Sequence, residues 1–163
     1  MNQLQAKSAI AVQKVLDEKG LICKVVELSS STRTAQDAAA SIGCNVGQIV
    51  KSLIFKTQLT NKPVLILASG PNKVDEKVIE KHVGEKIIKA DADFTRDITG
   101  FAIGGIPPIG HKQAIEFIFM DKDLLTFNDV WAAAGTPRAV FNVSSQDLAK
   151  LIDHAKIISL SGN

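Results

Sequence analysis

Ile49-Val50-Lys51-Ser52-Leu53-Ile54-Phe55 is the stretch that decides the fold, because it has the pattern of a strand with apolar residues on both faces. Side chains alternate between the two faces of a strand. Lys51 therefore shares its face with three apolar residues, Ile49, Leu53 and Phe55. This pattern favours a central strand, in which an unpaired ammonium group costs several kcal/mol. A lysine at such a position is expected to have a hydrogen-bond or charge partner, or to serve a function. The alternative is that Lys51 lies near a sheet edge and extends its amine into water.

Helices and strands follow one another in mixed order along the chain. Apolar periodicity and capping signals predict helices at about 5–19, 34–43, 74–82 and 144–153, and a helical turn at 93–99. Strands are predicted at 21–28, 49–57, 63–69, 87–90, 101–104, 115–120, 129–133, 138–143 and 157–160. Because strands come in pairs with helices between them, this order favours a mixed, largely antiparallel sheet over a doubly wound parallel one. We therefore predict a single α/β domain over residues 1–163.

Length and composition are those of one ordinary globular domain. The chain has 163 residues, of which 45% are hydrophobic and 22% charged. It has no run of about 18 apolar residues that would predict a membrane span, and its N-terminus lacks the apolar segment of a signal peptide. Cys23 and Cys44 do not have metal-ligand spacing, so we expect reduced thiols, no metal and a cytoplasmic protein.

The charge balance limits the kind of partner. A net charge of +2 excludes the heavily basic surface of a non-specific DNA or RNA coat, but it is compatible with a local patch that grips one end of an RNA. Lys73, Lys77 and Lys81 recur at i, i+4 and i+8 and predict a basic row along a short helix. The alternative is a solvated face, because Glu76 and Glu80 lie between these lysines.

A glycine–proline loop is the second candidate site feature. Four of the eleven glycines and two of the five prolines lie in 100–110. Glycine allows the backbone to approach a ligand and proline fixes the loop, so its N–H groups can point at an oxyanion or a phosphate; a strand-connecting turn is the alternative. His111 at its end is either a general base or ligand, or a structural residue. A Ser–Lys dyad of Ser52 and Lys51 is geometrically poor, because neighbours on a strand point to opposite faces.

Other motifs leave few chemical classes open. The chain has no Walker loop, no metalloprotease signature and no serine-hydrolase elbow, so we expect no cofactor and no nucleoside triphosphate chemistry. A further loop at 133–137 follows an apolar strand that contains Trp131. It is first of all a turn, and if it lies beside the glycine–proline loop, its backbone can form the other wall of a pocket.

Four ordered fragments carry a family resemblance: Gly47–Leu53, Gly100-Phe101 with Gly104, Pro108–His111, and Ala134–Thr136. In their order and spacing, over about residues 5–160, the chain resembles the YbaK family. These proteins are aminoacyl-tRNA deacylases that also occur as the editing domain inserted in bacterial prolyl-tRNA synthetases. The resemblance implies a freestanding member of α+β type, with a barrel-like sheet flanked by helices.

The family's activity is hydrolysis of the ester that links a wrong amino acid to the terminal adenosine of a tRNA. The resemblance gives Lys51 the place of the lysine on which this activity chiefly depends. It implies that the aminoacyl group is received by two loops, at Gly104, Ile106, Pro107, Pro108, Ile109, Gly110, His111, Gly135 and Thr136. The implied partners are the acceptor end of an aminoacyl-tRNA, which the lysine row would meet, and a prolyl-tRNA synthetase.

One departure from the family bears on the substrate. Members that resemble the cysteinyl-tRNA(Pro) deacylase have a serine and an aspartate where this chain has Ala134 and Phe141. The resemblance therefore favours small amino acids such as alanine, serine or threonine over a cysteine-specific activity. Two other functions remain open, a non-catalytic module that binds aminoacyl-tRNA or an amino acid, and a general esterase. Whether Lys51 acts protonated or neutral also remains open.

Overall fold

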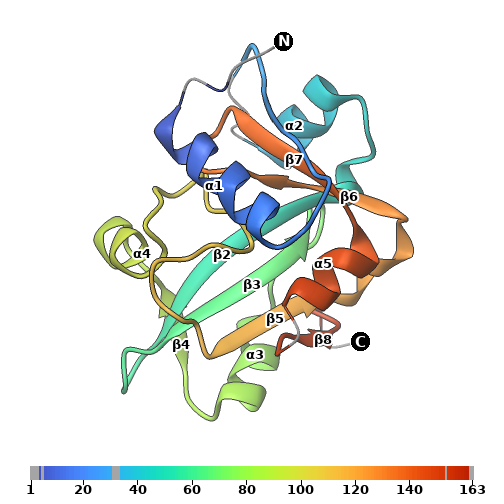
Figure 1. Cartoon of the computed structure of the whole chain (residues 1–163). Coiled ribbons are helices and arrows are strands. Elements are labelled where there is room, and N and C mark those ends of the chain that lie inside the picture. Colours follow the sequence, from blue (N-terminus) through green and yellow to red (C-terminus); the bar gives the residue numbers. More distant parts are fainter. Residues whose placement is uncertain (1–3, 5, 31–33, 153, 162–163) are drawn as a thin grey trace.

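The structure is a computed structural model that describes residues 4, 6–30, 34–152 and 154–161. Its strands form one sheet, and helices lie on both faces of this sheet (Figure 1). The helices are α1 (Lys7–Glu18), α2 (Ala35–Ile42), α3 (Glu76–Val83), α4 (Ala92–Thr99), α5 (Ser145–Leu151) and the short 3-10 helices η1 (Val46–Gln48) and η2 (Lys122–Thr126). The strands are β1 (Val25–Glu27), β2 (Ile49–Thr57), β3 (Pro63–Ser69), β4 (Ile87–Lys89), β5 (Phe117–Asp121), β6 (Asp129–Ala133), β7 (Ala139–Ser144) and β8 (Lys156–Ile158).

The sheet is mixed, as predicted. Its strand order is β1-β7-β6-β2-β3-β5-β8, and β4 pairs with β2 beside this path. Among the described residues, four strand pairings are antiparallel and three are parallel. The parallel partners β6, β5 and β8 join strands that are distant in sequence, so the sheet is less antiparallel than the order of the elements alone indicates.

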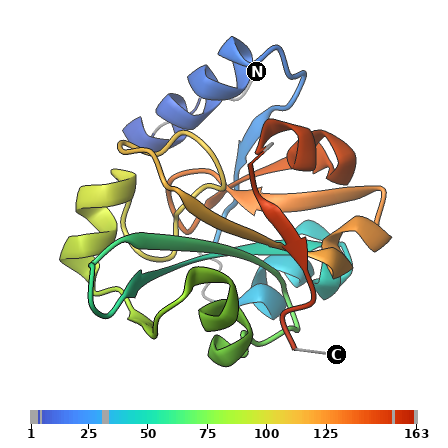
Figure 2. The ribbon, with the colours of Figure 1, turned by 90° about the horizontal axis from the view of Figure 1, so that it is seen from below.

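Both faces of the central strands are buried. Val64 and Ile66 of β3 belong to the cluster that includes Ile79 of α3, whereas Leu65 and Leu67 belong to the larger cluster under α1. All five side chains are fully buried. Figure 2 shows α1 and α3 on opposite sides of the sheet. This layered packing explains why β2 and β3 have apolar residues at nearly every position.

Helix ends confirm several local predictions. The Thr34 hydroxyl accepts a hydrogen bond from the Asp37 N–H at 3.0 Å and caps α2, and Ser144 caps α5 in the same way. Gly43, Gly84 and Gly100 end α2, α3 and α4 in the left-handed conformation.

Two strand predictions are corrected. Residues 101–104, predicted as a strand, form a turn, and Gly104 has φ +97°, which no strand residue adopts. The apolar side chain of Phe101 is buried in the core without being part of the sheet. The strand predicted at 21–28 is limited to Val25–Glu27, because only these residues pair with β7. Part of the polar loop at 29–33 lies outside the described residues.

One edge of β2 is interrupted, and this interruption positions the site. Along one edge, β2 pairs with β3 from Val50 to Lys56. Along the other edge, it pairs with β6 only at Ile49 and Val50 and with β4 only from Phe55 onward. In the described part of the chain, no strand therefore pairs with this edge over residues 51–54. We call this segment the open edge of β2.

The described helices include none with the length and apolar character needed to cross a membrane.

Candidate functional site

Lys51 lies on β2, beside its open edge, and its side chain is half-buried. It lies between Ile49, which packs against α2, and Phe55, which packs against α3, so the predicted phase of the strand is confirmed. The Nζ atom donates a hydrogen bond of 2.6 Å to the main-chain carbonyl oxygen of Asn72. Lys51 is thus held by a neutral acceptor in a partly apolar setting.

The environment of Lys51 shifts its protonation equilibrium. Burial lowers the pKa of the Lys51 amine below its ordinary value; the negative charge of Asp121 opposes this effect, and the positive charge of Lys73 adds to it. The lowered pKa shows that burial outweighs the favourable carboxylate. An amine in such an environment is a recognised mark of functional sites.

The turn that holds Lys51 is anchored by a buried carboxylate. Asp121 ends β5, and its Oδ2 atom accepts hydrogen bonds from the Ser69 N–H at 3.0 Å and from the Asn72 side-chain amide at 2.8 Å. The same amide also donates to Asp123 at 2.7 Å. These bonds fix the carbonyl oxygen that receives Lys51. Sequence reasoning missed Asn72 and Asp121, although a carboxylate at the end of the apolar strand Phe117–Asp121 was a visible signal.

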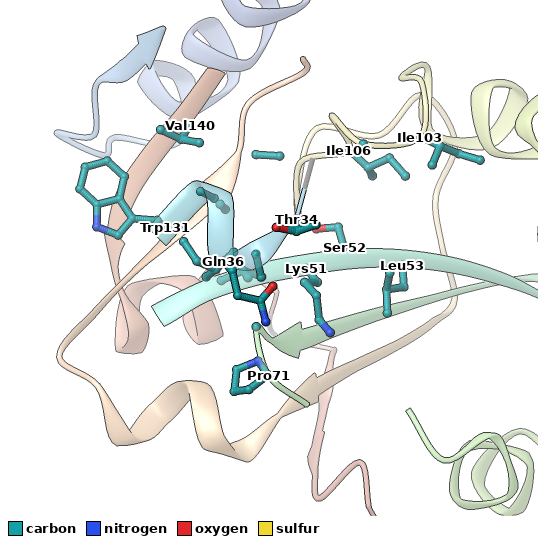
Figure 3. A pocket seen from close by; sticks show the side chains of 18 of the residues that line it. Thr34, Gln36, Lys51, Ser52, Leu53, Pro71, Ile103, Ile106, Trp131 and Val140 are labelled. Atoms are coloured by element: carbon teal, nitrogen blue, oxygen red, sulfur yellow. The ribbon is translucent and has the colours of Figure 1, made fainter. Parts of the chain in front are cut away.

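Two cavities, each of about 520 Å³, lie along the open edge of β2. Lys51, Ser52 and Leu53 line both cavities, together with Lys73, Ile103 and Ile106. Figure 3 shows Lys51 leaving β2 toward Pro71, whereas Ser52 leaves on the opposite face, toward Ile106. We call the cavity that also contains Thr34, Gln36 and Trp131 the first cavity, and the one that contains Glu76, Lys89 and Thr95 the second.

The predicted loop residues divide into two groups. Gly104 and Ile106 line the first cavity. Pro107, Pro108 and Ile109 are buried behind the cavity wall, and Gly110 packs against Val15 of α1. Neither cavity is lined by these last four residues, by His111, by Gly135 or by Thr136.

The two loops lie side by side, as the hypothesis of a two-walled pocket requires. The Gly135 N–H donates to the Gly105 carbonyl oxygen at 2.8 Å. A Cβ atom at Gly105 would lie only 2.7 Å from the backbone of Gly135 and Thr136, so only glycine allows this approach. The second loop therefore supports the first from behind and fixes the position of Gly104 and Ile106.

His111 has a partner inside the loop. Its Nε2 atom lies 2.7 Å from the Pro107 carbonyl oxygen, which only accepts, so this nitrogen carries the proton. Burial lowers the pKa of His111, an effect that this hydrogen bond opposes. The imidazole thus joins the two ends of the Pro107–His111 segment, which is the geometry of a structural residue.

Of the three lysines in the predicted basic row, only Lys73 lies at the cavities, and it lines both of them. Lys77 and Lys81 are exposed on α3 and line neither. Lys89 of β4, which sequence reasoning did not single out, lines the second cavity. The second cavity thus has three lysines in its wall, Lys51, Lys73 and Lys89.

Thr34, Gln36 and Trp131 were not predicted at the site either. They come from the start of α2 and from β6, and they meet β2 only through the sheet topology. Ala134 and Phe141, the two positions that depart from the cysteine-specific pattern, are fully buried in the core and bring no polar group to either cavity. Over the described residues, no three His, Cys, Asp or Glu side chains gather as a metal site requires.

Comparison with known proteins identifies the family. The model of the aminoacyl-tRNA editing domain matches residues 29–151, so the chain belongs to the aminoacyl-tRNA editing domain family. The match contains β2, both loops and all residues that line the two cavities.

Three relatives are similar to this chain. A solved structure described as a candidate trans-editing enzyme for prolyl-tRNA synthetase is 42% identical, with a TM-score of 0.89 over 96% of this chain and 98% of that one. The protein YwhH of Bacillus subtilis (strain 168) is 29% identical over 126 residues, which are 77% of this chain and 79% of YwhH. The proline–tRNA ligase of Limosilactobacillus fermentum is 26% identical over 121 residues, which are 72% of this chain but only 21% of the ligase.

Proposed function

We propose that this protein is a trans-editing hydrolase that cleaves the ester of mischarged aminoacyl-tRNA. The observation that carries the proposal is the position of Lys51. A half-buried amine with a lowered pKa, held by a neutral carbonyl, lies on the shared wall of two cavities in a chain of the editing family. The similarity to a ligase for proline and to a candidate trans-editing enzyme favours tRNA(Pro) carrying a small amino acid.

In this proposal the ester lies at the open edge of β2. Water adds to the ester carbonyl carbon, the bond from this carbon to the ribose oxygen breaks, and the ribose oxygen leaves with a proton that comes from the water. The products are the free amino acid and the uncharged tRNA. The Lys51 ammonium stabilises the negative charge that develops on the ester oxygens or belongs to the adjacent phosphate.

The two cavities suit the two halves of the substrate. The first is mostly apolar and takes the small amino-acid side chain against Gly104 and Ile106. The second, with three lysines in its wall, takes the phosphate-bearing acceptor end. The proposal keeps Pro107–Gly110, His111, Gly135 and Thr136 as residues that hold the wall of the first cavity. It places the activity in the cytoplasm, with a prolyl-tRNA synthetase as partner.

The test is a deacylation panel. tRNA(Pro) is charged with alanine, serine, threonine or cysteine, with prolyl-tRNA(Pro), alanyl-tRNA(Ala) and threonyl-tRNA(Thr) as controls. We expect at least one mischarged tRNA(Pro) to be cleaved well above the buffer blank, while prolyl-tRNA(Pro) is spared. Binding without cleavage of any ester would instead identify a non-catalytic module. Hydrolysis of p-nitrophenyl acetate at a rate similar to that of the tRNA ester would identify a general esterase.

A further inference from the structure

The main chain of Ser52 faces the open edge of β2. In a strand, the N–H and C=O groups of successive residues point alternately to its two edges. On the interrupted side, Val50 pairs with Ala132 of β6, and the Ile54 carbonyl oxygen accepts from the Ala90 N–H at 3.2 Å. Ser52 lies midway between Val50 and Ile54, so its N–H and C=O point to the same edge as theirs, the interrupted one. On that edge no described strand pairs with Ser52.

The side chain of Ser52 is also unsatisfied. Its Oγ atom is buried and has no hydrogen-bond partner among the described residues, although Ser52 lines both cavities. Buried hydroxyl groups without a partner are rare in native structures, because each loses its bonds to water without replacing them. Three polar groups of Ser52, the N–H, the C=O and the Oγ, thus have no partner in a neighbouring strand or side chain of the described residues.

An aminoacyl group has the atoms needed to satisfy the main-chain pair. Its amino nitrogen and its carbonyl oxygen are attached through one α-carbon, as in a residue of a β-strand. Two residues opposite each other in an antiparallel pair exchange two hydrogen bonds, with their α-carbons about 5.5 Å apart. A single amino acid can therefore pair with Ser52 without any further strand.

We propose that the aminoacyl group of the substrate binds the open edge of β2 as a one-residue strand opposite Ser52. The substrate's amino group donates to the Ser52 carbonyl oxygen, and the Ser52 N–H donates to the ester carbonyl oxygen. This inference rests on the function proposed above and adds the group that recognises the amino acid. The same N–H stabilises the oxyanion when water adds to the ester carbon.

This pairing also sets where the amino-acid side chain lies. Side chains of directly opposed residues share one face of a sheet. The substrate side chain therefore lies beside the Ser52 hydroxyl and toward Ile106, in the first cavity (Figure 3). Lys51 lies on the other face. The Ser52 hydroxyl then distinguishes a side chain that can hydrogen-bond, such as that of serine, from one that cannot, such as that of alanine.

The first experiment changes the substrate and leaves the protein intact. Deacylation of alanyl-tRNA(Pro) is compared with that of propionyl-tRNA(Pro), which lacks only the amino group, and seryl-tRNA(Pro) with 3-hydroxypropionyl-tRNA(Pro). Because the ammonium group also activates its own ester toward water, each enzymatic rate is divided by the rate of the same ester in buffer. The amino group donates a charged hydrogen bond, so we expect its loss to lower this normalised kcat/KM by about 10- to 100-fold. Equal normalised rates for both members of a pair would overturn this inference and leave the proposed function standing. Absence of cleavage of every ester in the panel would overturn both.

The second experiment separates substrate recognition from a structural contribution of the hydroxyl. Ser52→Ala removes the Oγ atom, and Ser41→Ala makes the same change at an exposed position of α2 that lines neither cavity. For Ser52→Ala we expect a Tm no lower than that of the wild type and a several-fold fall in the ratio of kcat/KM for the seryl and alanyl esters. Ser41→Ala leaves this ratio unchanged. A lower Tm with an unchanged ratio would show that the hydroxyl serves the fold and would overturn its part in recognition.

Discussion

Lys51→Met separates what this side chain does for the reaction from what it does for the fold. Methionine retains an unbranched side chain of similar length but has no charge. In the wild type, the Lys51 ammonium gains one charge-assisted hydrogen bond from the Asn72 carbonyl oxygen, a bond of about 1.5–3 kcal/mol. Burial and the nearby Lys73 act against the charged form, and the lowered pKa shows that these effects exceed the attraction of Asp121.

The sign of the effect on stability follows from the lowered pKa. The folded state binds the Lys51 proton less tightly than the unfolded state does. The cost of burying the protonated amine is therefore complete at every pH below the folded pKa, and it disappears as the pH rises from the folded pKa to the ordinary value of the unfolded chain. Methionine removes this cost together with the hydrogen bond. We expect the free energy of unfolding at pH 7 to change by less than about 1 kcal/mol.

The expected effect on the reaction is much larger. If Lys51 stabilises the charge of the transition state, its loss lowers kcat by about 10²- to 10³-fold. The assay is single-turnover deacylation of the best mischarged tRNA(Pro), and urea unfolding measures stability. The matched control is Lys56→Met on the same strand, where a half-buried lysine with its Nζ 5.3 Å from the centre of the Phe94 ring lines neither cavity. Full activity of Lys51→Met, or a loss of several kcal/mol of stability with a proportionate loss of folded protein, would refute the reasoning.

Three further predictions concern the loops and the lysines. Gly105→Ala places a methyl group 2.7 Å from the backbone of the second loop and lowers the free energy of unfolding by about 1–3 kcal/mol in urea denaturation. Wild-type stability falls as the pH drops below 6.5, because the unfolded chain takes up a proton that buried His111 resists; His111→Gln makes this slope in thermal unfolding shallower. Lys73→Gln and Lys89→Gln each reduce the slope of log binding constant against log salt for deacylated tRNA(Pro) by about 0.7–1, and Lys77→Gln, outside both cavities, reduces it less.

Local features of the fold were predictable because neighbouring residues determine them. The bounds of β2 and β3 agree with the predicted strands at 49–57 and 63–69, since both are apolar runs that end at polar turns. The Thr34 and Ser144 caps were visible because a side chain meets an N–H only three residues away. Residues 101–104 were mistaken for a strand because the core takes Phe101 from a turn, and apolar periodicity does not distinguish the two.

Sequence alone predicted a site residue only where its polarity differs from that of the residues around it in the sequence. Lys51 stood out because a charge interrupts an apolar strand. Asn72 and Asp121 did not stand out, and Ser52 was considered only as a dyad partner of Lys51, since the importance of all three depends on which strands adjoin them. The parallel pairings of β2 with β6 and of β3 with β5 join segments far apart in the chain, and no local pattern records them.

The change of partner along β2 links these features physically. Within five residues, the strand exchanges β6 for β4. Between them no described strand pairs with this edge over residues 51–54, and there the Ile54 carbonyl oxygen accepts only from the Ala90 N–H. An edge left open inside a sheet loses main-chain hydrogen bonds. The sequence places the half-buried Lys51 amine on one face of this edge and, on the opposite face, the Ser52 hydroxyl, which has no partner in the described part of the chain. Consecutive strand residues point to opposite faces, so Lys51 and Ser52 can act on one ester from two sides only if that ester lies in the plane of the sheet. Between β6 and β4 no described strand adjoins β2, and this gap leaves room for the ester in the plane of the sheet. One bound ester therefore accounts for the open edge, for Lys51 and for Ser52 together.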